Sequence, residues 1–432
     1  MSKSTKSLRI ALVHPEMIIG GAERLMLDLG IGLQNHGHKV DLYAGYLNKN
    51  SVFPEVLDDN PKTTFSTRIY GNWIPRSFFG KFHALLAIVR MIYLSLCLCV
   101  LKCFHKIHYD LVICDTVAPS IPFLRLLGCP VFFYCHFPDR FLSQPSKNPL
   151  KRVYRAAIDF FDAFSMGKAT KIAVNSKFTQ SKFKLAFPKL NQTPMVLYPP
   201  VNVPAARKQR EEALNRLNSG TSTLPEKVTS HLADPTKKTV FVSINRFESK
   251  KNLQLALDAF YAGGTDHTGF IKPWHLVFAG GYNSQTKDNV ETLKKLQTKV
   301  KDLNIEDSVT FMTNITNEQK AELLTASRCC IYTPSDEHFG IVPVEAMAFQ
   351  CPVVAVNSGG PMESIVDRVT GFLVPPNAAE LGAVLSLRFD DDEAQREMGK
   401  NGLDRADKIF GLDTFGNEIN NIVVSLCSTK SD

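Results

Sequence analysis

The stretch around Glu337 has the pattern of a buried strand, a polar loop and a helix, which together form one βα unit. Cys329–Tyr332 is apolar and short enough to be a buried strand. The loop that follows contains Glu337 and Gly340, and Val344–Phe349 has the composition of a helix. Glu345 is therefore expected in the first turn of that helix, on the ligand edge of a parallel sheet.

The same pattern recurs directly afterwards. Cys351–Val356 is predicted to be a strand, Asn357–Pro361 a turn with two glycines, and Met362–Val366 the start of a helix. Glycines allow a ligand to approach the backbone closely. In a parallel α/β sheet these loops lie at one edge, where ligands bind.

These loops suit a ligand that carries both phosphate and hydroxyl groups. Unpaired N–H groups at the helix start after Gly340 favour an anion. The carboxylates of Glu337 and Glu345 would accept hydrogen bonds from hydroxyl groups. A sugar nucleotide presents both kinds of group. Two glutamates at this spacing are common by chance, but the order of strand, glutamate, glycine, glutamate, strand and Gly-Gly-Pro turn is far more specific.

These motifs resemble the donor site of the retaining glycosyltransferases of family 4, which have the GT-B fold. The signature of that family is a pair of glutamates separated by seven residues, here Glu337 and Glu345, followed by a turn such as Gly359-Gly360-Pro361. The fuller runs Glu337–Met347 and Ala355–Pro361 are similar to those of the eukaryotic mannosyltransferases that add the second and third mannoses to the dolichol-diphosphate oligosaccharide.

Composition sets the broad class. The 432 residues, of which 44% are hydrophobic, predict two or three domains with large cores. The net charge of +8 is spread along the chain, and no nucleic-acid motif accompanies it. The ten cysteines include no C-x-x-C pair, which predicts reduced thiols and a cytosolic face. The polar Met1–Ser7 and the short apolar Leu8–Val13 predict a first core strand rather than a secretory signal.

The first half opens with a βαβ unit. Leu8–Val13 and Lys39–Ala44 are predicted strands, and Ala22–His36 is the helix between them. The loop carries Gly20-Gly21-Ala22-Glu23 rather than G-x-G-x-x-G, so no dinucleotide is expected here. The family resemblance implies that this turn faces the donor diphosphate and the acceptor; an ordinary tight turn is the alternative.

A histidine ends another predicted strand of this half. His136 follows Val131–Cys135, at the edge where parallel strands end. A lone histidine is usually structural, but this position favours a role in a site. The resemblance implies that His136 lies next to the donor sugar, which it would orient and polarise without acting as a nucleophile.

The second half begins at the predicted strand Thr239–Ile244. Arg246 follows this strand and Lys251 precedes the predicted helix Leu253–Tyr261. The planar fork of an arginine and the point charge of a lysine together suit a diphosphate, although a solvated surface pair is the alternative. The resemblance implies that both residues hold the donor diphosphate and stabilise it as it leaves.

The resemblance also implies the remaining binding residues. Glu337 would accept hydrogen bonds from the mannose hydroxyls and Glu345 from those of the ribose. His275–Gly281 is a predicted strand that ends in a glycine turn, and this turn would lie near the nucleotide. The full set of substrate-binding residues expected in this half is Gly280, Gly281, Phe339, Gly340, Ile341, Val342 and Glu345.

No metal site is predicted. Asp390-Asp391-Asp392 formally matches the D-x-D of metal-dependent glycosyltransferases, but it follows an apolar helix and is interpreted as a solvated turn. We expect no required cofactor, and a divalent cation would have no identifiable site in the sequence.

The expected architecture is α/β of the GT-B class, with two Rossmann-like domains that face a deep cleft. The predicted divisions are an N-terminal acceptor- and membrane-facing domain at 1–205, a linker with a helical insert at 206–236, a nucleotide-sugar domain at 237–410, and a helix at 411–432 that crosses back to the first domain.

The resemblance implies transfer of mannose from GDP-mannose, with retention, to a dolichol-diphosphate-linked oligosaccharide through α-1,3 and α-1,6 linkages. Expected partners are therefore the two substrates, the endoplasmic reticulum membrane and other glycosyltransferases of the pathway, with no nucleic acid. Two alternatives are a related family 4 transferase with another nucleotide sugar or lipid acceptor, and a non-catalytic protein that binds sugar nucleotides.

The apolar segment Phe82–Leu101 has the length of a membrane span. Arg90 near its middle disfavours insertion, and the strands before and after the segment should belong to one sheet. The preferred hypothesis is a helix half-sunk in the cytosolic leaflet of the endoplasmic reticulum, with Arg90, Lys102 and Lys106 reaching lipid phosphates. A helix buried against the sheet is the alternative.

Overall fold

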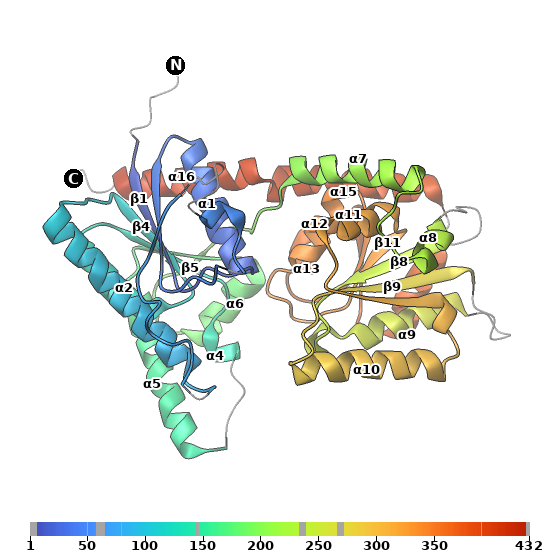
Figure 1. The fold of residues 1–432 in the computed structure, drawn as a ribbon, viewed down its shortest axis with the longest axis horizontal. Coiled ribbons are helices and arrows are strands. Elements are labelled where there is room, and N and C mark those ends of the chain that lie inside the picture. Colours follow the sequence, from blue (N-terminus) through green and yellow to red (C-terminus); the bar gives the residue numbers. More distant parts are fainter. Residues whose placement is uncertain are drawn as a thin grey trace. The chain divides into compact units, whose positions relative to one another are not determined.

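The chain forms two compact α/β units in the computed structural model (Figure 1). The structure describes residues 7–49, 51–57, 65–78, 80–142, 147–232, 239–265, 272–389 and 391–428. Unit 1 comprises Met1–Pro200 with Leu412–Asp432, and unit 2 comprises Val201–Gly411. The chain therefore changes units at Pro200 and again at Gly411.

Unit 1 contains a seven-stranded sheet in the order β3-β2-β1-β4-β5-β6-β7, with every pair parallel. Its strands are β1 (Arg9–His14), β2 (Lys39–Ala44), β3 (Ser66–Ile69), β4 (Leu111–Asp115), β5 (Val131–Cys135), β6 (Lys171–Val174) and β7 (Met195–Val196). The predicted bounds of β2 and β5 are confirmed. The first strand is shifted by one position, so that His14 ends it instead of beginning the loop.

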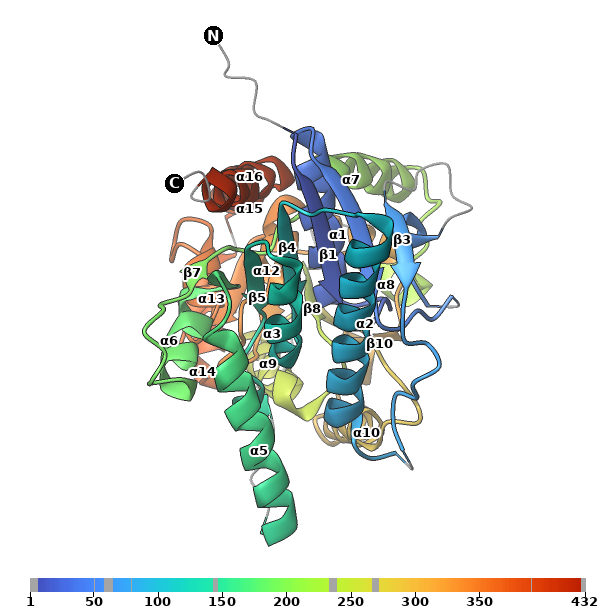
Figure 2. The ribbon, with the colours of Figure 1, turned by 90° about the vertical axis from the view of Figure 1, so that its left-hand side faces the viewer.

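Helices cover both faces of this sheet. They are α1 (Gly21–Asn35), α2 (His83–His105), α3 (Ile121–Leu124), α4 (Asp139–Leu142), α5 (Pro149–Met166), α6 (Lys177–Ala186) and α16 (Leu412–Ser428), with short 3-10 turns η1 (Pro54–Val56), η2 (Ala118–Ser120) and η3 (Arg125–Leu127). One core lies under α1 and α16, and a second lies under α2, α3 and α6. Figure 2 shows α2 and α5 on the side of unit 1 that faces the viewer.

The C-terminal helix α16 packs directly on α1. A side chain at Gly32 would place its Cβ 3.0 Å from the Cα of Gly416, so small residues permit the close approach. His38 and Asn420 add a polar contact of 2.8 Å between their side chains. These contacts place the end of the chain in unit 1.

Unit 2 contains a six-stranded parallel sheet in the order β10-β9-β8-β11-β12-β13. Its strands are β8 (Thr239–Ile244), β9 (Trp274–Gly280), β10 (Val309–Thr313), β11 (Cys329–Tyr332), β12 (Val353–Val356) and β13 (Gly371–Val374). The predicted bounds of β8 and β11 are confirmed. Both are short apolar runs, which suits strands covered on both faces.

The helices of unit 2 surround this sheet. They are α7 (Val203–Asn218), α8 (Glu226–Leu232), α9 (Leu253–Gly264), α10 (Lys287–Asp302), α11 (Asn317–Ala326), α12 (Ile341–Ala348), α13 (Pro361–Ser364), α14 (Ala378–Arg388) and α15 (Asp392–Phe410), with 3-10 turns η4 (Ser249–Lys251) and η5 (Glu306–Ser308). The core of the unit lies between β8, β9, β11 and helices α9 and α14.

The segment 206–236, expected to be a linker, is instead part of unit 2 as far as the structure describes it. The reason is a fully buried carboxylate on α11, Glu322. It accepts hydrogen bonds from Arg216 at 2.5 Å, from the Ser222 hydroxyl at 2.6 Å and from the Thr223 backbone N–H at 3.0 Å. A buried carboxylate needs such partners, so the segment is fixed to the sheet domain. Residues 233–236 lie outside the described residues.

Candidate functional site

Two side chains far apart in the sequence meet at the C-terminal edge of the unit 2 sheet. Lys251, at the end of η4, forms an ion pair with Glu337, in the loop after β11. The Tyr332 hydroxyl donates a second hydrogen bond to Glu337 at 3.3 Å. Burial would raise the pKa of Glu337, but the nearby Lys251 ammonium outweighs this and lowers the pKa. Glu337 is thus a carboxylate at neutral pH and can only accept hydrogen bonds.

The glycine turn after β12 packs against the Glu337 loop. A Cβ at Gly359 would lie 2.4 Å from the Glu337 carbonyl oxygen, and one at Gly360 would lie 2.0 Å from that of Phe339. The Gly360 N–H donates to the Glu337 carbonyl at 2.8 Å. The two glycines therefore let one protein loop approach another, whereas the sequence analysis explained them by close approach of a ligand.

Helix α12 begins at Ile341 instead of Val344. Gly340 precedes it with φ of 75°, a left-handed conformation that suits glycine. Glu345 consequently lies in the second turn of the helix and not in the first, which corrects the predicted position. Its carboxylate pairs with Lys320 of α11 at 2.9 Å. As at the start of any helix, the first N–H groups of α12 have no partner within the helix, and N–H groups in this position can bind an anion.

The other expected binding residues of this loop differ in exposure. Phe339 is buried, with its ring centroid 5.7 Å from that of Phe410. It could touch a ligand only through its backbone. Ile341 is exposed and Val342 is partly exposed, so their side chains are accessible.

Arg246 also lies at this edge, directly after β8, but it does not reach the Lys251–Glu337 pair through any contact between described residues. Its side chain is 61% exposed, and its guanidinium pairs with Glu248 at 2.8 Å. The glycine turn beside it has a packing role, since a Cβ at Gly280 would lie 2.0 Å from the Asn245 carbonyl oxygen. Gly281 accepts the Phe247 N–H at 3.0 Å through its carbonyl.

Unit 1 holds a polar cluster at the C-terminal ends of β1, β4 and β5. Asp115, fully buried, joins two histidines: its Oδ1 is 2.7 Å from Nδ1 of His14, and its Oδ2 is 2.8 Å from Nε2 of His136. Nε2 of His14 lies 3.6 Å from a carboxylate oxygen of Glu23. His136 itself is partly exposed, so one ring edge is held while the other is accessible.

His14 and Asp115 are both ionised at neutral pH. Burial would lower the pKa of His14, but the adjacent Asp115 and then Glu23 raise it to about 10. Burial would likewise raise the pKa of Asp115, yet His14 and His136 lower it to about 2. A carboxylate facing Nε2 of His136 favours the tautomer with a proton on that nitrogen. Nδ1 of a neutral His136 is then a hydrogen-bond acceptor.

Three members of these clusters were not predicted from the sequence: Asp115, His14 and Lys320. Asp115 ends β4, and His14 ends β1. Both could have been found from the rule that strand ends meet at one edge of a parallel sheet. Lys320 lies on a helix that the sequence analysis did not single out.

A pocket of about 350 Å³ lies beside the unit 1 cluster. Its lining comes from the ends of β1 and β4, the start of α1, and the first turns of α2: His14, Pro15, Glu16, Ala22, Glu23, Arg76, His83, Ala84, Ala87, Thr116 and Val117. Glu16 pairs with both Arg76 and Arg90 at 2.7 Å. Of the expected turn residues, Glu23 lines the pocket, and its carboxylate folds back so that a Cβ at Gly20 would lie 2.4 Å from it. A Cβ at Gly21 would meet nothing within 4 Å.

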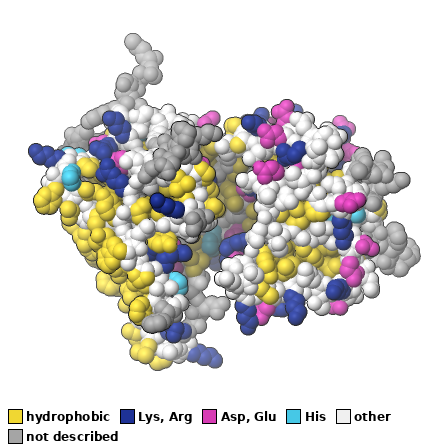
Figure 3. Space-filling view, in the orientation of Figure 1, with side chains coloured by type: hydrophobic (Ala, Val, Ile, Leu, Met, Phe, Trp, Pro, Cys, Tyr) yellow, Lys and Arg dark blue, Asp and Glu magenta, His cyan; other side chains and the backbone are white. Residues whose placement is uncertain are grey.

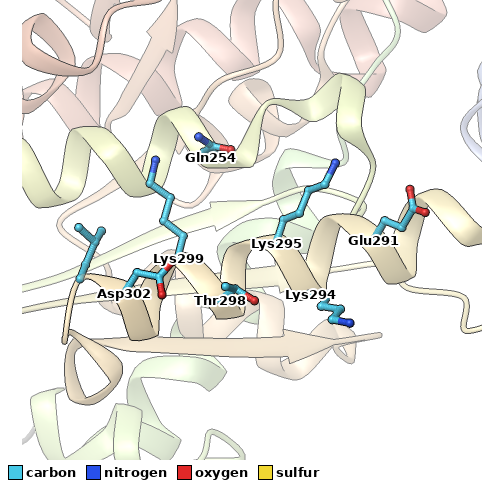
Figure 4. A pocket seen from close by; sticks show the side chains of 8 residues that line it. Gln254, Glu291, Lys294, Lys295, Thr298, Lys299 and Asp302 are labelled. Carbon is cyan, nitrogen blue, oxygen red and sulfur yellow. The ribbon is translucent and has the colours of Figure 1, made fainter.

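A larger hollow of about 630 Å³ lies on the surface of unit 2 (Figure 4). It is lined from α9 and α10 by Gln254, Glu291, Lys294, Lys295, Thr298, Lys299, Asp302 and Leu303. Both charge signs occur in it, and Lys299 already pairs with Asp258 at 2.5 Å. None of the predicted site residues lines this hollow, so we do not connect it with the predicted chemistry.

The D-x-D match has a structural explanation within the described residues. Asp391 caps α15 by accepting the N–H of Glu393 at 2.8 Å, and Asp392 pairs with Arg328. Asp390 lies outside the described residues. Among the described residues, no group of three or more His, Cys, Asp or Glu side chains is arranged to hold a metal ion.

Comparisons with known proteins agree with this architecture. Residues 226–405 match the family model of glycosyl transferases group 1, and residues 19–203 match that of glycosyltransferase family 4. Among solved structures, Anabaena HepE in complex with UDP has a TM-score of 0.71 at 18% identity, with 97% of this chain and 100% of that chain covered. The sucrose-phosphate synthase of Thermosynechococcus elongatus has a TM-score of 0.69 at 19% identity, covering 98% and 100%. These likenesses show the GT-B fold.

Curated relatives match over almost the whole chain. The alpha-1,3/1,6-mannosyltransferase ALG2 of Dictyostelium discoideum is 37% identical, with 99% of this chain and 100% of the relative covered. The ALG2 proteins of Mus musculus and Homo sapiens are 38% and 37% identical, each with 96% of both chains covered. On these full-length matches, the chain belongs to the family of alpha-1,3/1,6-mannosyltransferases.

Proposed function

We propose that this enzyme transfers mannose from GDP-mannose, with retention, to a dolichol-diphosphate-linked oligosaccharide, converting Man1GlcNAc2 to Man2 and then Man3 through α-1,3 and α-1,6 linkages. Family membership gives the mannosyl transfer. The observation that carries the donor assignment is the Lys251–Glu337 pair beside the start of α12. Cation, carboxylate and free helix N–H groups together match a sugar diphosphate.

Each residue of the unit 2 edge has a proposed task. Glu337 accepts hydrogen bonds from the mannose hydroxyls, because its lowered pKa keeps it ionised. Lys251, Arg246 and the N-terminus of α12 stabilise the charge that develops on the leaving diphosphate. Glu345 accepts from the ribose hydroxyls, for which it would exchange its contact with Lys320.

The proposed chemical step needs no covalent intermediate. An acceptor hydroxyl oxygen bonds to C1 of mannose on the face from which GDP departs. The bond from C1 to the diphosphate oxygen breaks with its electrons, and the acceptor proton passes to that oxygen. His136 would orient the sugar by accepting a hydroxyl hydrogen bond at Nδ1, with Asp115 fixing the ring.

The pocket of unit 1 is the proposed acceptor site. Glu16, Glu23, Arg76 and His83 offer charged and polar groups for sugar hydroxyls or phosphate. The first turns of α2 form one wall of this pocket. A lipid-linked acceptor could therefore place its polar part in the pocket while its lipid follows the apolar surface of α2.

The structure supports a membrane-attached position for α2. It is the helix, among the described residues, that is long and apolar enough to cross a membrane, with a mean hydropathy of 2.5. The strand before it, β3, pairs with β2, and the strand after it, β4, pairs with β1 of the same sheet. If α2 crossed the membrane once, β3 and β4 would lie on opposite sides of the bilayer and could not belong to one sheet. We therefore propose that α2 lies in the cytosolic leaflet of the endoplasmic reticulum.

Two details of the sequence hypothesis need correction. Arg90 is 1% exposed and its guanidinium donates to Glu16 at 2.7 Å, so it points into unit 1 rather than toward lipid phosphates. Lys102 donates to the Leu127 carbonyl at 2.8 Å. Lys106, after the helix, is exposed. Attachment through α2 therefore depends on its apolar outer face and not on snorkelling from its middle.

The decisive experiment is transfer of radiolabelled mannose from GDP-mannose to a dolichol-linked trisaccharide by the purified enzyme. Two successive additions are expected, both sensitive to α-mannosidase. UDP-glucose and UDP-N-acetylglucosamine serve as donor controls. Transfer from one of these alone would assign another nucleotide sugar, and binding of GDP without transfer from any donor would support the non-catalytic alternative.

A further inference from the structure

Helix α5 exposes a broad apolar face, whereas its buried residues are both polar and apolar: Ile158, Asp162, Ser165 and Met166. Its outward residues have exposed fractions between 50% and 79%: Leu150, Val153, Phe160, Phe161 and Phe164. At 3.6 residues per turn these positions fall within an arc of about 100° on one face. Single exposed apolar side chains are ordinary, but a continuous stripe that includes three phenylalanines marks an interaction surface.

An ion pair between α5 and α4 holds this orientation in place. Arg155 on the inner side pairs with Asp159 at 2.9 Å and with Asp139 of α4 at 2.5 Å. Asp162 is buried on the same side. Rolling the helix to cover its phenylalanines would break the pair with Asp139, whereas the pair with Asp159 lies within α5 and would turn with the helix. The Arg155–Asp139 pair thus favours the orientation in which the stripe is exposed.

The α5 stripe continues the apolar face of α2. On α2, the exposed residues Leu85, Val89, Tyr93, Leu96, Val100 and Phe104 likewise share one face. Both helices pack on the short segment Ala118–Leu127, and Phe82 at the start of α2 meets Tyr154 of α5 with ring centroids 6.2 Å apart. Figure 3 shows hydrophobic side chains gathered over these two helices.

The charges around the α5 stripe select its partner. Lys147, Lys151 and Arg152 are exposed at its N-terminal end, and Lys168 follows its C-terminal end with its ammonium 5.3 Å from the Phe164 ring centroid. The acidic residues of the helix, Asp159 and Asp162, belong to the inner side. Cations at both ends of an aromatic stripe complement a leaflet that contains anionic lipid.

We propose that α5 is a second membrane-inserting helix, whose phenylalanines enter the interfacial region while the basic residues at its ends hold anionic headgroups. This inference rests on the proposed membrane-attached function and extends it from one helix to two. Two non-collinear helices fix how unit 1 is oriented on the bilayer, which one helix alone leaves free to rotate. In Figures 1 and 2, the N-terminal turns of α5 project beyond the neighbouring elements of unit 1.

Vesicle flotation of the full-length enzyme tests this proposal. The variant Phe160→Ser/Phe161→Ser/Phe164→Ser should bind vesicles of phosphatidylcholine with phosphatidylserine at least tenfold more weakly than wild type. Lys151→Glu/Arg152→Glu should lose binding to those vesicles but change little on phosphatidylcholine alone. Leu185→Ser, a 67% exposed leucine on α6, is the matched control and should bind as wild type. Because all these residues are exposed, unchanged melting temperatures are expected.

A separate variant of α2, Leu96→Glu/Val100→Glu, distinguishes insertion of α5 from the proposed attachment through α2. If the α5 variants bind as wild type and the α2 variant is released, the α5 inference is wrong and the α2 attachment stands. If neither is released, both are wrong. A shift of the enzyme from dimer to monomer in the triple variant, with unchanged vesicle binding, would assign the stripe to a second copy of the chain and overturn the proposal.

Discussion

The carboxylate of Asp115 lies 2.8 Å from Nε2 of His136, the histidine expected to contact the transferred sugar. The same carboxylate contacts the buried His14 at 2.7 Å. Asp115 therefore holds both the partly exposed ring of His136 and the buried ring of His14. Asp115 is thus a positioning residue for His136. The same carboxylate, together with Glu23, raises the pKa of His14 to about 10, so that His14 is charged at neutral pH.

The first prediction concerns Asp115→Asn. The amide can present its NH₂ group to His136, which would turn the ring to the wrong tautomer, and misplacement of this kind costs about 10²-fold in rate. We expect kcat to fall by about this factor with little change in the KM for GDP-mannose. His136→Gln should be as slow, and the double variant no slower than either one. A folded Asp115→Asn enzyme with wild-type kcat would contradict the positioning role.

The pH dependence of stability should report His14. Its pKa is raised from 6.5 to about 10 in the folded chain, so its stabilising contribution is complete below pH 6.5 and is lost as the pH rises toward 10. The difference in unfolding free energy between wild type and His14→Gln should therefore shrink by up to about 1.4 kcal/mol per pH unit in this window. Urea unfolding at pH 6.5, 8 and 9.5 measures it. The exposed His108→Gln serves as control, and an equal, constant difference for both variants would refute the assignment.

The Lys251–Glu337 pair should matter for both rate and stability. Lys251→Met leaves a carboxylate without its cation, and removal of a preorganised charge typically costs about 10²–10³ in rate. Glu337→Gln should be similarly slow. A double-mutant cycle on unfolding should give a coupling of about 0.5–3 kcal/mol, whereas the exposed pair Lys287–Glu291, 3.5 Å apart, should give about 0–0.5 kcal/mol. Wild-type turnover in folded Lys251→Met would remove the diphosphate role.

Glu345 and Glu337 should differ in their effect on nucleotide binding. Glu345→Gln should weaken GDP binding measured by calorimetry, because this carboxylate is assigned to the ribose. Glu337→Gln should leave GDP binding nearly unchanged and impair transfer, because its assigned partner is the mannose that GDP lacks. Lys320→Met removes the cation that pairs with Glu345 at 2.9 Å. This variant shows how much of the loss of GDP binding arises from a change in the position of the Glu345 side chain. The opposite ranking of the two glutamates would exchange their roles.

Sequence patterns predicted the elements whose apolar residues face inward. The strands Thr239–Ile244 and Cys329–Tyr332 were located with their observed bounds, because each is an apolar run that ends at polar residues. Because the loops that follow parallel strands lie at one edge of the sheet, the sequence also placed Lys251 and Glu337 at the same edge. It could not show that the two side chains pair.

Helix α5 shows that a sequence pattern does not identify the buried face of an amphipathic helix. Its periodicity is that of an amphipathic helix, but periodicity does not tell which face is buried, and here Arg155 and Asp162 face inward while Phe160 faces solvent. The start of α12 was misplaced for a related reason. The apolar composition that predicts the helix begins at Val344, whereas the left-handed conformation of Gly340 ends the loop and lets the helix begin at Ile341.

The last prediction tests the attachment of α2 to the membrane. Charge on its outer face, as in Leu96→Glu/Val100→Glu, should release a folded enzyme from microsomes because these side chains are 43% and 53% exposed. Charge at Leu94 or Leu98 should instead unfold unit 1, since these leucines are 0% and 2% exposed and a buried charge without a partner is very costly. Those two positions, although equally apolar in sequence, therefore cannot be used to probe lipid contact.

Topology decides between attachment and crossing. Protease sites and single-cysteine labels placed before and after α2 should both be reached from the cytosolic side of sealed microsomes, because β3 and β4 belong to one sheet. Labels that report opposite sides of the membrane would require β4 to leave its neighbour β1, with which it pairs from Ile10 to Val13. That outcome would be incompatible with the fold of unit 1 and would refute the proposed position of α2. Two cytosolic labels together with release of the outer-face variant would place the helix in the leaflet.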